Sequence, residues 1–236
     1  MKKLLFALLL APLLAQAAAV ELHLDRAPDR SGNMAALQHG AKLFVNYCLN
    51  CHSAQGMRYN RLQDIGLSDQ QIKENLMFTA DKVGEEMTIA MRRDDAKKWF
   101  GVPPPDLTLE ARARTSELGS GADWLYTYLR SFYRDDERPT GWNNTVFPNV
   151  AMPDVLWQLQ GEQALGADGK LSLEQPGKLT AAQYDADVAD LVGYLQYMGE
   201  PAAHTRRRLG VFVLLFLSAF FVLAYALKRE FWKDIH

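Results

Sequence analysis

The stretch Cys48-Leu49-Asn50-Cys51-His52 decides how the rest of the chain is interpreted. Its spacing, C-x-x-C-H, is the attachment signature of c-type haem. At this spacing both thiols can form thioether bonds to the porphyrin, and the adjacent histidine reaches the iron as an axial ligand. Because no second C-x-x-C-H occurs in the 236 residues, we expect one covalently bound haem c.

Three other interpretations of the two cysteines are weaker. A disulfide across C-x-x-C would close a very small loop and stabilise little. A zinc site would need more ligands, and there is neither a second cysteine pair nor an H-x3-H motif. A thioredoxin-like redox pair would need a βαβ context. The residues before Cys48 instead predict a helix over 33–47, because Asn33 is a good N-cap and apolar side chains follow at helical spacing.

Met152 is the predicted sixth ligand of the iron. It lies in an irregular stretch, 135–153, at a distance of 100 residues from His52, and the proline that follows it stiffens the chain. Methionine as the axial partner of histidine raises the reduction potential of a haem. His39 and His204 are the alternatives, the first on the predicted helix before the cysteines and the second beside an apolar C-terminal segment.

Other side chains are candidates for the wall of a haem pocket. Pro105, the last of three consecutive prolines, could line an apolar surface together with Trp99 and Phe100. Arg112 and Arg114 could pair with the haem propionates, because a guanidinium matches a carboxylate in geometry. An ordinary proline turn and solvated surface charges are the alternatives for these positions.

The two ends of the chain carry targeting and membrane patterns. Residues 1–19 combine two early lysines, an apolar run too short to span a bilayer and two A-x-A patterns, which indicates a secretory signal peptide cleaved after Ala17 or Ala19. An uncleaved anchor is the alternative. Residues 209–227 contain no charge and are long enough to cross the hydrocarbon core as a helix. Three basic residues flank this span on each side, so its orientation depends on the signal peptide.

These patterns divide the chain into four parts: a signal peptide (1–19), a periplasmic domain (20–205), a transmembrane helix (206–228) and a cytoplasmic tail (229–236). The formal charge of −2 hides a value of −8 for residues 18–205 and +4 for residues 206–236. The basic flanks of the span suit a lipid bilayer with anionic headgroups. An acidic exported domain and a pI near 6.2 argue against binding to nucleic acid.

The periodicity of the exported part predicts a mainly α fold. Helices are predicted over 33–47, 68–80, 84–99 and 122–132, and a last one begins at the capping box formed by Thr180 and Gln183. Residues 155–160 and 170–174 are predicted to form a small hairpin. Together these features predict a class I-like cytochrome c domain with insertions, followed by one C-terminal transmembrane helix.

The chain resembles the cytochrome c1 family in motifs that follow one another along nearly the whole mature sequence. Besides the haem motif, the matching stretches are RYNRL at 58–62, PPDLT at 104–108, ARAR at 111–114, AMP at 151–153, GEP at 199–201, RRR at 206–208 and YALKREFW at 225–232. The haem motif alone is shared by many families, so the other stretches and the C-terminal anchor are the specific part. Residues 115–124 look longer than expected, and the acidic docking segment of larger members has no clear match.

The resemblance implies a role for each matching residue. Cys48 and Cys51 hold the haem, His52 and Met152 ligate the iron, and the segment that contains Pro105 packs on the haem. Arg114 pairs with a propionate. The implied protein is the haem subunit of a dimeric cytochrome bc1 complex (quinol–cytochrome c oxidoreductase) in a bacterial inner membrane, within a respiratory or photosynthetic chain.

The resemblance also implies partners and a reaction. The membrane helix packs against cytochrome b, and single electrons pass from a Rieske iron–sulfur protein to a soluble or anchored cytochrome c. No substrate bond is made or broken on this chain. Two other classes remain as alternatives. One is an anchored subunit of a terminal oxidase or nitric oxide reductase, and the other is a haem peroxidase or sensor with an open sixth site.

Overall fold

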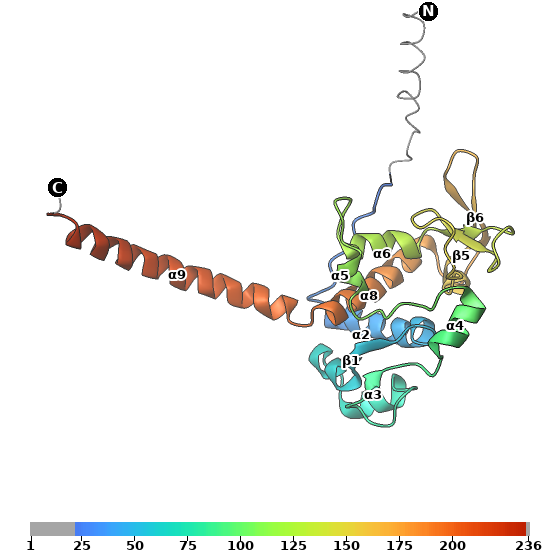
Figure 1. Cartoon of the computed structure of the whole chain (residues 1–236), viewed down its shortest axis with the longest axis horizontal. Coiled ribbons are helices and arrows are strands. Elements are labelled where there is room, and N and C mark those ends of the chain that lie inside the picture. The colour runs from blue at the N-terminus through green and yellow to red at the C-terminus, as the bar shows by residue number, and fades with distance from the viewer. Residues whose placement is uncertain (1–21, 235–236) are drawn as a thin grey trace, which may run out of the picture.

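The computed structural model describes residues 22–234, so the predicted signal peptide lies outside the described residues. Figure 1 shows a folded body from which one long helix, α9, projects. The body is mainly helical and its strands form three separate two-stranded antiparallel sheets. This architecture confirms the expectation of a mainly α domain followed by a single C-terminal apolar helix.

The described chain alternates short helices with paired strands and ends in two long helices. The helices are α2 (Met34–Leu43), the π-helical turn η2 (Phe44–Cys48), the 3-10 helix η3 (Tyr59–Ile65), α3 (Asp69–Asn75), α4 (Arg93–Phe100), α5 (Glu110–Ala113), α6 (Gly121–Leu129), α7 (Trp157–Gln160), α8 (Ala181–Gly199) and α9 (Ala203–Phe231). The strands are β1 (Ala54–Arg58) paired with β2 (Glu86–Met87), β3 (Phe132–Arg134) paired with β4 (Trp142–Asn144), and β5 (Gly161–Leu165) paired with β6 (Leu171–Pro176).

The core is centred on the crossing of α2 and α8. Gly40 permits the close approach, because a β-carbon at this position would collide with the backbone carbonyl of Asp190. Beyond the crossing, the ring of Phe44 packs against that of Tyr194 with 5.5 Å between centroids, and both residues are fully buried. The contact fixes the direction in which α2 delivers the turn that contains the cysteines.

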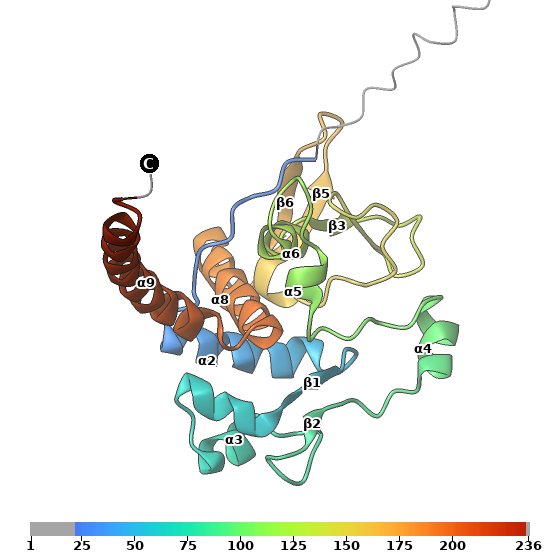
Figure 2. The same cartoon turned by 60° about the vertical axis from the view of Figure 1, so that its left-hand side comes forward.

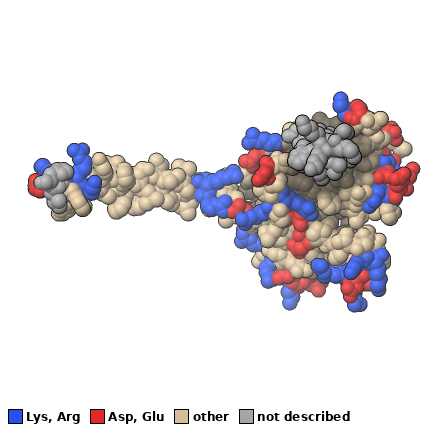
Figure 3. Space-filling model, turned by 45° about the horizontal axis from the view of Figure 1, so that its top comes forward, with Lys and Arg blue, Asp and Glu red and all other residues tan. Residues whose placement is uncertain are grey.

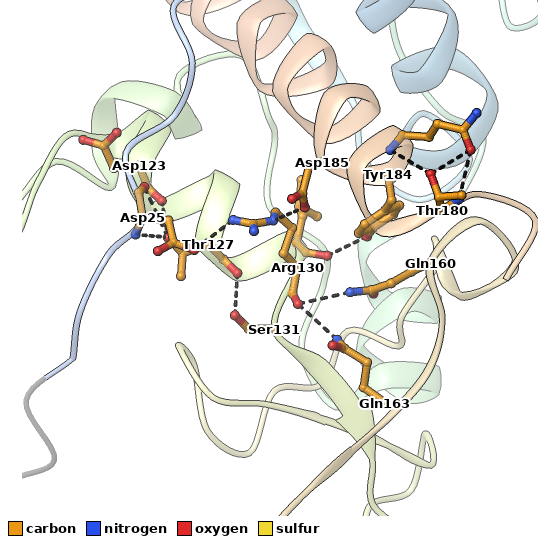
Figure 4. A network of polar contacts seen from close by, with 12 residues as sticks. Asp25, Asp123, Thr127, Arg130, Ser131, Gln160, Gln163, Thr180, Tyr184 and Asp185 are labelled. Atoms are coloured by element: carbon orange, nitrogen blue, oxygen red, sulfur yellow. Dashed lines mark hydrogen bonds and ion pairs between the residues drawn. The ribbon is translucent and has the colours of Figure 1, made fainter. Parts of the chain in front are cut away.

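The segment before α2 is fastened to α6 and α8 by side chains (Figure 4). The amide of Asp25 donates to Oγ1 of Thr127 at 2.8 Å, and the amide of Ala27 donates to Oδ1 of Asp123 at 2.7 Å. Arg130, at the end of α6, forms ion pairs with Asp25 at 2.8 Å and with Asp185 of α8 at 2.6 Å. The start of the described chain is therefore held by residues about one hundred positions later.

Helix α9 matches the predicted membrane span. It is the one helix among residues 22–234 that is long and apolar enough to cross a bilayer, and none of its residues is buried within the chain. Figure 3 shows that α9 has no charged side chains along its middle, whereas Lys and Arg side chains gather at both of its ends. At the end next to the body, Arg206 pairs with Glu200, and Arg207 lies 3.8 Å from Asp29.

Several predicted boundaries are confirmed and others are wrong. Asn33 and Thr180 are N-caps as expected, Thr180 within a capping box, and Ser68 caps the predicted helix at 68–80 with a capping box of its own. The predicted helix over 84–99 is wrong in its first half, where Met87 is buried by pairing with Ala54 of β1, and only α4 is helical. Figure 2 shows α4 standing away from the body.

The hairpin and the irregular stretch also differ from expectation. Residues 157–160 form α7 rather than a strand, and the hairpin begins at Gly161, whose φ of 100° ends the helix. The stretch predicted as a loop over 135–153 contains β4, and the predicted helix over 68–80 ends at Asn75. The strand β4 arises from pairing with β3, which local periodicity does not report.

Candidate haem site

The cysteine motif follows a π-helical turn at the end of α2. The turn η2 ends at Cys48, and the amides of Cys51 and His52 both donate to the carbonyl of Cys48, at 3.1 and 2.9 Å. Single π-turns within helices occur frequently at functional sites. Cys48 is buried, Cys51 is half-buried, and the two thiols are not bonded to each other.

The environment of the thiols disfavours a reactive dithiol. Burial raises the pKa of Cys48 to about 12, with a smaller contribution from Cys51, and burial also raises the pKa of Cys51. Redox-active cysteines have lowered pKa values, because the thiolate is the reactive form. Among the described residues no group of three or more His, Cys, Asp and Glu side chains is arranged to hold a metal ion. The zinc alternative therefore has no ligand set in this part of the chain.

The ring of His52 is oriented by Pro105. Nδ1 of His52 donates to the carbonyl oxygen of Pro105 at 2.8 Å. A histidine that donates one ring N–H to a carbonyl presents the lone pair of its other nitrogen to a metal. Burial lowers the pKa of His52, against smaller opposing effects of Pro105, Glu110 and Asp106, so the ring is kept neutral as ligation requires.

The segment that contains Pro105 is fastened along the residues after the haem motif. The amide of Leu107 donates to the carbonyl of Ser53 at 2.9 Å, and the amide of Gln55 donates to Asp106 at 2.8 Å. Trp99, in contrast, is 67% exposed on α4 and packs edge-on against Phe100. The structure thus places Pro105 in contact with His52, whereas Trp99 lies on the exposed surface of α4.

Met152 lies against an aromatic cluster on α6. The hydroxyl of Tyr128 donates to Sδ of Met152 at 3.4 Å. The Tyr128 ring stacks on Trp124 with 4.7 Å between centroids and contacts the edge of Phe132 at 5.0 Å. The methionine is half-buried at the margin of the core, with its sulfur accepting the hydrogen bond.

Arg114, at the end of α5, contacts the aromatic cluster on the methionine side. Its Nε donates to Glu110 at 2.8 Å, and its guanidinium carbon lies 4.5 Å from the centre of the Trp124 ring. Glu110 is among the charges that act on His52, while the charge of Arg114 acts on Tyr128. The short helix α5 therefore joins the two predicted ligand sides. Arg112 does not share this position, since its side chain lies beside Gly199.

The alternative ligands are placed elsewhere. Nδ1 of His39 lies 3.1 Å from Asp190, at the crossing of α2 and α8. His204 lies beside Gly32 at the base of α9. Neither contacts the aromatic cluster around Met152, so the geometry gives both histidines other surroundings.

A buried acid follows the predicted methionine ligand. Asp154 is 4% exposed, and its Oδ1 accepts from the amide of Leu156 at 2.8 Å, while Oδ2 has no hydrogen-bond partner among the described residues. Burial raises its pKa to about 7, and the hydrogen bond from Leu156 only partly opposes this effect.

Sequence reasoning missed two polar residues of the methionine side, Tyr128 and Asn144. Nδ2 of Asn144 donates to the carbonyl of Tyr128 at 2.8 Å, and its Oδ1 accepts from the amides of Val146 and Phe147. The aromatic residues at 124 and 128, four positions apart on one helix, and the paired asparagines shortly before Met152 were signals available in the sequence.

Comparison with known proteins finds a matching family and relatives that cover the full chain. Residues 27–235 match the Cytochrome C1 family. The chain is 52% identical over 236 residues to the ammonia monooxygenase gamma subunit of Nitrosomonas europaea, covering all of this chain and 98% of that one. It is 47% identical to the cytochrome c1 of Allochromatium vinosum, with both chains covered in full. Against the cytochrome c1 of Rhodospirillum rubrum the identity is 28%, over 84% of this chain and 81% of the relative.

Proposed function

The chain belongs to the cytochrome c1 family, and from this premise we propose that it holds one haem c through thioether bonds from Cys48 and Cys51, with His52 and Met152 as iron ligands. Members of the family are membrane-anchored electron-transfer subunits of the cytochrome bc1 complex, beside cytochrome b and a Rieske iron–sulfur protein. The chain is accordingly the haem subunit of a bc1-type oxidoreductase. The oxidase, nitric oxide reductase and peroxidase alternatives are not favoured.

The hydrogen bond from His52 to Pro105 carries the ligand proposal. It fixes the ring so that Nε2, rather than Nδ1, is available to the iron. The two unbonded thiols lie one and four residues before this histidine. The charge of Glu110 acts on His52, and Glu110 is bound to Arg114, which contacts Trp124 in the cluster around Met152. These residues together fit a covalent haem with one nitrogen and one sulfur ligand.

The proposed reaction is the transfer of single electrons, with no substrate bond made or broken on this chain. When bound, the haem supplies an iron that alternates between the ferric and ferrous states, so one electron is accepted and one is passed on. Cys48, Cys51 and His52 hold the group on one backbone turn, and the thioether of Met152 favours the reduced state. Arg114, partly exposed and already bound to Glu110, is positioned to offset propionate charge.

We place the haem domain in the periplasm and the residues after α9 in the cytoplasm. The signal peptide predicted over 1–19 supports this orientation, and the basic groups at the two ends of α9 suit the two lipid surfaces. Fusing a reporter that is active only in the periplasm to the C-terminus tests the assignment. The proposal expects an inactive reporter, and an active one contradicts it.

The electron partners are proposed to be the Rieske protein as donor and a soluble or anchored cytochrome c as acceptor, within a dimeric complex. Acidic side chains occur at Glu85 and Glu86, on the first turn of α4 and in the loop between β3 and β4, and they would attract a basic acceptor. The attraction is measured by the salt dependence of the rate at which a basic cytochrome c oxidises the haem. A rate that does not depend on salt would contradict the proposed attraction.

The ligand proposal is tested by Met152→Leu. Leucine keeps the apolar volume and removes the sulfur. The variant is expected to keep its covalent haem, to lose the near-infrared band of ferric methionine-ligated haem and to have a lower midpoint potential. Survival of that band in the variant would show that another residue ligates the iron.

The assembly proposal is tested by isolating the full-length chain from membranes in a mild detergent and measuring haem per chain. Recovery together with a b-haem protein and a Rieske protein is the expected result. The name of the Nitrosomonas europaea relative gives a second candidate, a subunit of an ammonia-oxidising monooxygenase. Recovery with monooxygenase subunits and without cytochrome b would favour that candidate.

A further inference from the structure

Among residues 22–234, the hydroxyl of Tyr128 is the one side-chain group that forms a hydrogen bond with the sulfur of Met152. Its oxygen lies 3.4 Å from Sδ, within the range expected for a hydrogen bond to sulfur. We infer that Tyr128 is a positioning residue that raises the midpoint potential of the haem by donating a hydrogen bond to the sulfur of Met152. This inference rests on the proposed ligation by Met152.

The electronic argument concerns the lone pairs of the thioether. A hydrogen bond to the sulfur withdraws electron density that would otherwise be donated to the iron. Ferric iron, the more electron-poor state, loses more stabilisation from this withdrawal than ferrous iron does. Hydrogen bonding to a ligand by a neighbouring residue is one of the means by which a protein sets a haem potential. The bond from Tyr128 therefore favours the reduced state.

The surroundings of Tyr128 hold its hydroxyl at the sulfur. The residue is 7% exposed, and its ring is clamped between Trp124 and Phe132. A phenol has an ordinary pKa of about 10, so at neutral pH the hydroxyl of Tyr128 keeps its proton and stays a donor. No other hydrogen bond of this hydroxyl is formed within the described chain.

A buried asparagine couples Tyr128 to the segment that delivers the methionine. Asn144 is 1% exposed, donates to the carbonyl of Tyr128 at 2.8 Å and accepts from the amides of Val146 and Phe147 at 2.8 and 3.1 Å. The preceding asparagine contributes too, since Oδ1 of Asn143 accepts from the amide of Asn149 at 2.8 Å. These hydrogen bonds connect α6, which carries Tyr128, to the residues that lead to Met152. The distance between the hydroxyl and the sulfur is therefore determined by contacts inside the protein.

The molecule contains a matched control for this contact. Tyr194 of α8 also donates to a methionine sulfur, that of Met87, at 3.7 Å, and both residues are fully buried. Met87 lies on β2 and is not a proposed ligand. Tyr194→Phe therefore removes the same kind of bond from the core without touching Met152.

The test compares Tyr128→Phe, Tyr194→Phe and Met152→Leu in the full-length protein. Potentials are measured by spectroelectrochemical titration, and ligation by the near-infrared band of the ferric protein. Tyr128→Phe is expected to keep the methionine band, shifted in energy, and to lower the midpoint potential, while Tyr194→Phe leaves both unchanged.

The possible failures are distinguishable. An unchanged potential and band in Tyr128→Phe, with loss of the band in Met152→Leu, overturns the role of Tyr128 and leaves the ligand proposal standing. Equal shifts in the two tyrosine variants also overturn it, because the effect would then be general loosening of the core. Survival of the band in Met152→Leu overturns this inference together with the ligand proposal.

Discussion

The two sides of the candidate haem site are built in different ways. The histidine side is almost contiguous in sequence: helix α2, its π-turn and the residues Cys48 to His52 follow one another, with one long-range bond to Pro105. The methionine side is assembled from α6, β4 and the residues before Met152 through side-chain hydrogen bonds. The first side is fixed by backbone and the second by polar side chains, so substitutions should affect them differently.

The largest expected effect comes from breaking the covalent part of the histidine side. Cys48→Ala combined with Cys51→Ala removes both thioether bonds and should abolish haem staining of the chain after a denaturing gel. Met152→Leu is the matched control from the other side and should retain full staining. Staining of the cysteine variant would mean that the haem is attached elsewhere.

The next largest effect is expected on stability, from a substitution at the crossing of α2 and α8 that supports the histidine side. A methyl group at Gly40 would collide with the backbone of α8 at Asp190, which cannot move aside as a side chain could. Gly40→Ala is expected to lower the free energy of unfolding by about 2–3 kcal/mol, a typical cost of overpacking. Denaturant titration measures this change. Gly84→Ala is the control because its β-carbon meets nothing within 4 Å, and equal effects of the two would contradict the prediction.

A smaller effect is expected from loosening the methionine side. Asn144→Ala leaves the carbonyl of Tyr128 and the amides of Val146 and Phe147 without their partner. Loss of partners for buried polar groups costs about 1–2 kcal/mol. The variant should unfold at lower denaturant and lose part of its methionine–iron band while keeping covalent haem. Equal loss of band and attached haem would show that the two sides are not separable.

The smallest expected effect on the free energy of unfolding is electrostatic. It concerns Asp123, in the first turn of the helix that carries Trp124 and Tyr128. Partial burial alone would raise the pKa of Asp123, but hydrogen bonds from Ser120 and the amide of Ala27 lower it below its usual value of 3.8. A lowered pKa stabilises the fold above that usual value, and the contribution disappears as pH falls through the folded value. Asp123→Asn should therefore cost less than about 1 kcal/mol at neutral pH.

The pH dependence of this cost is the informative measurement. The difference between the melting temperatures of the parent chain and Asp123→Asn should be largest at neutral pH and shrink toward zero as the solution is made more acidic than pH 3.8. A difference that does not change with pH would assign the effect to lost geometry rather than to the charge. Tyr184→Phe, which removes a buried hydrogen bond without a charge, gives the pH-independent reference.

The same contrast explains what could be predicted from sequence. The capped helices α2 and α8 were predictable because short stretches of local sequence determine where they begin, without help from distant segments. Met87 lies in a strand because it pairs with Ala54, and Asn144 is ordered by its hydrogen bond to the carbonyl of Tyr128. Local sequence around Met87 and Asn144 does not reveal these partners. Pro105 was expected to line a haem pocket with its ring, and that expectation stays a prediction. The structure adds a hydrogen bond from His52 to the carbonyl oxygen of Pro105, which could not be predicted because a carbonyl leaves no signature in side-chain composition.

The fastening of the first described residues by Arg130 has a consequence for the order of events during biogenesis. A chain that emerges N-terminus first exposes Cys48 to His52 long before Arg130 and Asp185 arrive to hold Asp25. The bond from His52 to Pro105 likewise waits for 53 further residues. Contacts between distant segments form late because closing long loops costs entropy. The topology therefore leaves the proposed haem-attachment motif accessible while α6 and α8 have yet to dock on the segment before α2.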